Sequence, residues 1–107
     1  MRNSLSSAAP VFAALGDETR LRLVERLCHE GAASITSLAR DAPMTRQAVT
    51  KHLRVMQNAG LVRCSRKGRE SYWELDQRRL KEVRRNLAVI SAQWDDALGR
   101  LRRFVED

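Results

Sequence analysis

The chain has 107 residues and a mass of 12.2 kDa, which is the size of one compact domain, expected to span 1–107. Its 43% hydrophobic and 31% charged residues are typical of a globular protein, and no apolar run approaches the roughly 18 residues of a transmembrane helix. The two cysteines and the polar N-terminus predict a cytoplasmic protein, with no membrane partner and no disulfide framework.

Positive charge is concentrated in the middle of the chain. Lys and Arg total 20 against 13 acids, and 17 of the 20 are arginine. Residues 1–39 have a net charge of zero, residues 40–85 a net charge of +8 and residues 86–107 a net charge of −1. Because the planar guanidinium suits phosphates and guanine edges, the middle segment is predicted to meet a polyanion.

The first elements are helical. Residues 1–7 are polar and predict a frayed tail, and residues 10–15 predict a short helix that ends at Gly16. Asp17 is a suitable N-cap for a second helix over 18–30. The apolar stripe of this second helix is expected to comprise Leu21, Val24, Leu27 and Cys28, with Leu23 flanking it. Cys28 is thereby interpreted as a small core residue, and a redox pairing with Cys64 is the alternative.

Two helices separated by a turn follow, over 36–58. Thr36 is the candidate N-cap of a short helix over 37–42, and the Pro43-Met44 turn separates it from a helix over 46–58 capped by Thr45. The longer helix has an apolar edge of Val49, Leu53 and Met56 and a polar face of Arg46, Gln47, Thr50, Lys51 and Arg54. Gly60 suits the position just past its end.

A hairpin is predicted over 61–75. Residues 61–66 and 70–75 have the composition of strands, and Lys67-Gly68-Arg69 forms a tight basic turn between them. Together with Arg66, this turn places cations at the tip of the hairpin.

The last predicted helix covers 77–105, with Asp76 as its cap. Its apolar or small residues recur at alternating steps of three and four, at Leu80, Val83, Leu87, Ile90, Trp94, Ala97, Leu101 and Phe104. At ~1.5 Å per residue the stretch 78–105 is about 42 Å long as a helix, more than so small a body covers. We therefore expect a homodimer surface here, and a stripe buried within the chain is the alternative.

The order helix, turn, helix and hairpin is typical of a winged helix-turn-helix that binds double-stranded DNA. An α-helix fits the major groove, and arginine or glutamine in its first turn can bind guanine or adenine edges. Arg46 and Gln47 are the candidates for base contacts, beside the helix cap Thr45. Thr50, Lys51 and Arg54 are expected near phosphates, and Arg66, Lys67 and Arg69 at the flanks. His52 either touches a phosphate or packs on the domain edge.

Four segments of the sequence are informative together. They are Ala14-Leu15-Gly16-Asp17-Glu18-Thr19-Arg20-Leu21-Arg22-Leu23-Val24, Met44-Thr45-Arg46-Gln47-Ala48-Val49-Thr50-Lys51-His52-Leu53-Arg54-Val55-Met56, Asn58-Ala59-Gly60-Leu61-Val62, and Arg66-Lys67-Gly68-Arg69-Glu70. In this order they resemble the opening helices, recognition helix, strand entry and wing of the ArsR/SmtB family of bacterial winged-helix transcriptional repressors. The resemblance covers about residues 11–105. It implies a homodimer joined through the terminal helices, which represses an operon until an inducer releases it. The implied interface is Val11, Phe12, Leu15, Leu87, Ile90, Trp94, Leu98, Leu101 and Phe104.

The chain departs from the metal-sensing members of that family. Where these carry a Cys-Val-Cys motif, this sequence has Ile35-Thr36-Ser37-Leu38, and residues 78–107 contain neither His nor Cys. Zinc and related ions favour thiolate or imidazole ligands, so we expect no metal site and no cofactor, and the inducer is unknown.

The sequence thus predicts a mainly α fold with a β-hairpin wing and a dimeric repressor that binds a pseudo-palindromic operator. A non-specific architectural DNA-binding protein and a winged-helix protein-interaction module are the alternatives. An enzyme is not expected, because the sequence offers no paired carboxylates, phosphate-binding glycine loop or catalytic triad.

Overall fold

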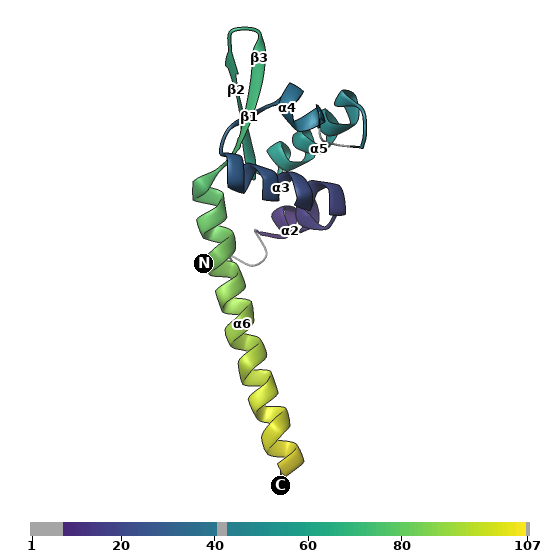
Figure 1. Ribbon diagram of the computed structural model, residues 1–107. Coiled ribbons are helices and arrows are strands. Elements are labelled where there is room, and N and C mark those ends of the chain that lie inside the picture. Colours follow the sequence, from purple (N-terminus) through teal and green to yellow (C-terminus); the bar gives the residue numbers. More distant parts are fainter. Residues whose placement is uncertain (1–7, 41–42, 107) are drawn as a thin grey trace.

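The computed structural model describes residues 8–40 and 43–106. In chain order the elements are α2 (Ala9–Leu15), α3 (Glu18–Glu30), β1 (Ala33–Ser34), α4 (Ile35–Arg40), α5 (Arg46–Asn58), β2 (Val62–Lys67), β3 (Glu70–Leu75) and α6 (Gln77–Glu106). The hairpin β2–β3 rises from the short helices, and α6 leaves the body in the opposite direction (Figure 1). The expected fold class, mainly α with a winged helix-turn-helix, is confirmed. The predicted tail over 1–7 and the predicted helical residues 41–42 lie outside the described residues.

Side-chain caps fix the starts of α3 and α5 where the sequence predicted them. The Asp17 carboxylate accepts a hydrogen bond from the Arg20 backbone N–H at 3.0 Å, and the Thr45 hydroxyl accepts one from the Ala48 backbone N–H at 3.1 Å. The end of α5 is closed by Gly60, whose φ of 82° places it in the left-handed region that glycine adopts easily. These local signals position α5 and direct the chain into the wing.

The start of α4 differs from the prediction, which placed it at residue 37 with Thr36 as the N-cap. The helix begins at Ile35, and the Ser34 hydroxyl accepts the Ser37 backbone N–H at 3.1 Å, so Ser34 is the capping residue and Thr36 lies inside the helix. The cause is a two-residue strand that the sequence analysis missed, β1, which pairs with β3 through Ala33 and Trp73 and through Ser34 and Tyr72. Two residues are too few to show an alternating pattern.

The three strands form an antiparallel sheet in the order β1-β3-β2. Lys67 faces Glu70, so the hairpin turn consists of Gly68 and Arg69 alone. Gly68 has a φ of 64° and stands first of the two, the position that type II′ turns reserve for glycine. The bounds of β3 were predicted correctly, and β2 starts one residue later than predicted.

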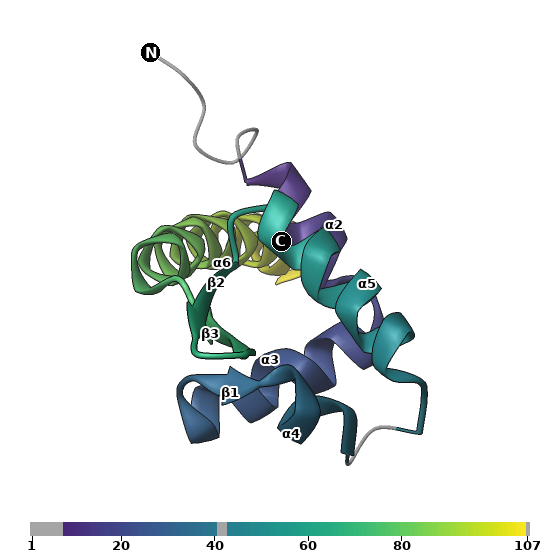
Figure 2. The same ribbon diagram turned by 90° about the horizontal axis from the view of Figure 1, so that it is seen from above.

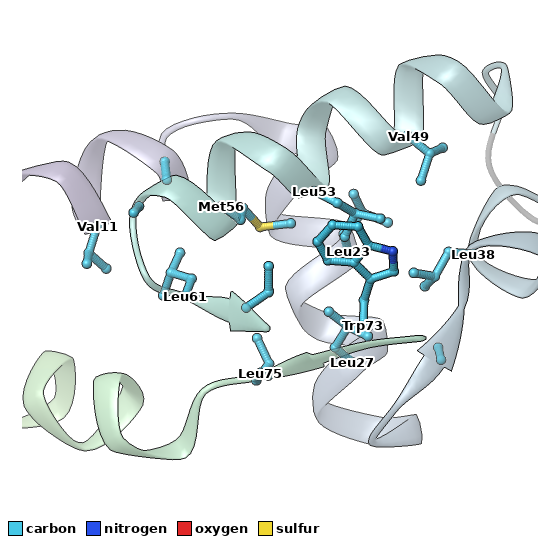
Figure 3. Close-up of a cluster of buried hydrophobic side chains, with 14 of the residues drawn as sticks. Val11, Leu23, Leu27, Leu38, Val49, Leu53, Met56, Leu61, Trp73 and Leu75 are labelled. Atoms are coloured by element: carbon cyan, nitrogen blue, oxygen red, sulfur yellow. The ribbon is translucent and has the colours of Figure 1, made fainter. Parts of the chain in front are cut away.

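The core joins α3, α4 and α5 to the sheet around Trp73 (Figure 3). Leu38, Val49, Leu53, Met56 and Leu61 are completely buried there. On α3 the buried residues are Leu23 and Leu27, whereas Leu21 is 48% exposed and Cys28 is exposed. The predicted stripe is thus correct for Leu27 and for Val24, which packs against the core, and wrong for Leu21. The interpretation of Cys28 as a core residue was also wrong.

Only the first turns of α6 pack on this body. The Asp76 carboxylate caps the helix by accepting the backbone N–H groups of Arg78 and Arg79, and Val83 is buried. Further along, the apolar stripe is open: the exposed fractions of Leu87, Trp94, Leu98, Leu101 and Phe104 run from 51% to 80%, and Ile90 is half-buried. The alternative of a stripe buried within the chain is wrong for this stretch.

The N-terminal part of the predicted dimer surface needs a correction. Val11 is 1% exposed and belongs to the core of its own chain, so its side chain is not available to a partner. Phe12 and Leu15 are partly buried against the same core.

In the described ranges, none of the helices combines the length and apolar character needed to span a membrane.

Candidate nucleic-acid interface

The burial of one face of α5 dictates which residues the other face presents. Val49, Leu53 and Met56 are 0% exposed and hold α5 against the core. This orientation leaves Arg46, Gln47, Lys51 and Arg54 exposed to solvent. In the view from above, α5 lies on one side of the molecule and the hairpin lies on the other (Figure 2). Four of the five residues of the predicted polar face of α5 are therefore accessible, and the fifth, Thr50, is half-buried.

A hollow of about 310 Å³ separates α5 from the wing. Its residues are Arg46, Thr50, Arg54 and Gln57 from α5, Cys64 and Ser71 from the hairpin, and Ile35 and Trp73. The structure thus brings three of the predicted residues together and adds Gln57, Cys64 and Ser71, which the sequence analysis missed. Gln57 continues the spacing of Arg46, Thr50 and Arg54 along the helix, and that periodicity could have identified it.

The first turn of α5 is connected to both neighbouring elements. The Thr50 hydroxyl donates to the Arg46 carbonyl oxygen at 2.9 Å. The Arg46 guanidinium lies 3.9 Å from Glu70 Oε1 on β3, and the Thr36 hydroxyl of α4 donates to the same oxygen at 3.2 Å. An acidic residue thus stands beside the cation predicted to contact a base.

The wing tip presents cations to solvent. Arg66, Lys67 and Arg69 are all exposed, and Lys67 Nζ lies 5.8 Å from the centroid of the Tyr72 ring, a cation–π distance. Within the described part of the chain, Arg66 and Arg69 form no ion pair, and neither do Lys51 and Arg54 on α5. No acidic side chain of the described residues therefore competes with an anionic partner for these four cations.

His52 turns toward α3, in agreement with the domain-edge alternative. Its Nδ1 lies 3.3 Å from the Arg20 guanidinium and 3.8 Å from the Asp17 carboxylate. Arg20 also donates to the Ala14 carbonyl oxygen at 2.6 Å, so this cluster ties α5 to α2 and α3. The pKa of Asp17 lies below its ordinary value of 3.8, mainly because its carboxylate accepts the hydrogen bond from the Arg20 backbone N–H. Nearby positive charge lowers this pKa further.

Comparisons with known proteins agree with this architecture. A family model described as a helix-turn-helix domain matches residues 15–65, from the end of α2 into β2. The HTH-type transcriptional regulator Rv2034 of Mycobacterium tuberculosis is 44% identical over 75 residues, which cover 69% of this chain and 68% of that one. An ArsR-like transcriptional regulator from Rhodococcus sp. RHA1 is 37% identical, with a TM-score of 0.75 over 92% of both chains. The chain belongs to the ArsR family of winged-helix transcriptional regulators.

The ArsR family consists of transcriptional regulators, and this membership identifies the chain as a regulator rather than an enzyme. The homodimeric winged helix-turn-helix DNA-binding domain Mb0332 of Mycobacterium bovis shares the fold, with a TM-score of 0.66 and 24% identity over 86% of this chain and 82% of that one. Among the residues that the structure describes in this ArsR chain, no three His, Cys, Asp or Glu side chains gather where they could hold a metal ion.

Proposed function

We propose that the protein is a homodimeric repressor that places α5 in the major groove of a pseudo-palindromic operator. The observation that carries the proposal is the surface of α5 and the wing. Arg46 and Arg54 line a hollow between them, and Gln47 and Lys51 are exposed on the same helix. This surface lies in the segment with a net charge of +8. A helix of this kind fits the major groove, and cations on either side fit the phosphates that border it.

Base contacts are assigned to the first turn of α5. Arg46 can bind guanine O6 and N7 with both arms of its guanidinium, and Gln47 can bind adenine N6 and N7. Thr45 holds the helix start, whose backbone N–H groups favour a phosphate. Thr50, Lys51 and Arg54 follow along the helix and fix the register, and Arg66, Lys67 and Arg69 of the wing bind the flanking backbone.

The dimer is proposed from the exposed apolar face of α6. Leu87, Trp94, Leu98, Leu101 and Phe104 present a continuous apolar surface that leaves the body of its own chain. An exposed patch of this extent marks an interaction site, and a second copy offers the same patch in return. Two-fold symmetry would place the two α5 helices about 34–36 Å apart, one turn of DNA. Such a repressor would act on its operator in the cytoplasm.

Selection from a pool of random duplexes tests this proposal. A dimer should enrich two inverted half-sites whose centres lie about 10–10.5 base pairs apart. Enrichment of one unpaired half-site would contradict the dimer, and binding without any enriched sequence would identify the architectural alternative. A chain that shows no salt-dependent DNA binding would be a protein-interaction module.

A further inference from the structure

The candidate DNA surface contains one carboxylate that the proposed function does not use. Glu70, the first residue of β3, has a 37% exposed side chain that reaches the start of α5. One of its oxygens lies 3.9 Å from the Arg46 guanidinium and 3.2 Å from the Thr36 hydroxyl. Glu70 therefore links the wing to both helices of the helix-turn-helix.

A negative charge at this place discriminates between the two kinds of acceptor that DNA offers to Arg46. A phosphate that approaches the guanidinium is repelled by the carboxylate beside it, whereas guanine O6 and N7, which carry only partial negative charges, are repelled much less. The carboxylate also restrains a long side chain whose free rotamers would otherwise be lost on binding. Specificity often depends on such an unfavourable term against the wrong partner.

We propose that Glu70 is a positioning residue that directs Arg46 toward a base edge and away from phosphates, and so sets the sequence discrimination of the protein. This inference rests on the proposed function, because it requires Arg46 to contact DNA. Thr36 belongs to the same arrangement, since its hydroxyl donates to the oxygen of Glu70 that faces Arg46. Both side chains are partly exposed, and such a pair contributes little to folding stability.

The test is Glu70→Gln, which removes the charge and keeps an oxygen that can accept from Thr36. Affinity for a scrambled duplex should rise about tenfold, and the preference for the selected operator should fall about tenfold, each equivalent to about 1.4 kcal/mol. The salt dependence on scrambled DNA should steepen by about one phosphate contact. The melting temperature should not change.

Glu74→Gln is the matched control. Glu74 lies on the same strand, is 43% exposed and pairs with Arg63 of the wing at 3.2 Å, so its substitution changes the net charge equally. It should leave the preference for the operator unchanged. In an Arg46→Ala background, Glu70→Gln should have no more effect than Glu74→Gln, because Glu70 acts through Arg46.

Three results would overturn the inference. They are equal effects of Glu70→Gln and Glu74→Gln, an undiminished effect of Glu70→Gln without Arg46, or a melting temperature lowered by Glu70→Gln alone, which would show a structural role. All three defeat this inference while the wild-type chain still prefers its operator. A wild-type chain without that preference would defeat the proposed function, and this inference with it.

Discussion

Trp94→Ala should separate the dimer into monomers that still fold. Trp94 lies on the open part of α6 and is 64% exposed in the single chain. Because a buried aromatic side chain covers about 150–250 Å², a partner could cover roughly 100–160 Å² of Trp94 in each protomer. At about 25 cal/mol per Å², and with the β-carbon retained in alanine, the loss is about 2–3 kcal/mol per protomer. For two protomers the dimer Kd should rise about 10³- to 10⁴-fold.

Sedimentation equilibrium over a concentration series measures this Kd directly. The matched control is Val89→Ala, because Val89 is 44% exposed on the same helix but lies about 140° around the axis from Trp94 at ~100° per residue. The control should leave the Kd nearly unchanged, and both variants should keep the wild-type helical circular dichroism. An unchanged Kd for Trp94→Ala, or a wild-type mass of 12.2 kDa at micromolar concentration, would refute the reasoning.

Three further predictions concern DNA contact and acid stability. Gln47→Ala should relax specificity at one base position at a cost of about 1–3 kcal/mol, and uniform weakening across a panel of operator variants would exclude a base contact. Arg69→Ala should weaken binding to all duplexes and lower the salt slope by about one, as a titration at several salt concentrations would show; an unchanged slope would place Arg69 away from phosphates. The lowered pKa of Asp17 means that the unfolded chain takes up this proton more readily, so the stability it contributes is present above the ordinary value of 3.8 and is lost as the pH falls through the lower folded value. Below about pH 4 the melting temperature of Asp17→Asn should therefore fall less with decreasing pH than that of the wild type. Parallel curves of melting temperature against pH would contradict the assignment.

Features specified by neighbouring residues were predictable from the sequence. The caps at Asp17, Thr45 and Asp76 lie within three residues of the N–H groups they accept, so each helix start is visible in the local pattern. The wing turn likewise needs a glycine at position 68, whose φ is 64°. The start of α5 and its helical spacing also set its polar face, of which only Gln57 was missed.

Features specified by distant residues were not predictable. The short strand β1 exists because Ala33 pairs with Trp73, 40 residues away, and that pairing also moves the start of α4. Apolar residues surround much of α3, so only its packing decides that Leu23 is buried and Leu21 is exposed. Glu70 reaches Arg46 through the fold of the wing, and no local spacing connects the two residues.

The most direct test of the account is the fluorescence anisotropy of the selected operator and of a scrambled duplex, titrated with the purified protein across a salt series. A sequence-specific repressor should prefer the operator by about 10³-fold or more, and should keep that preference while both affinities fall with salt. Equal affinities for the two duplexes at every salt concentration would contradict a sequence-specific repressor.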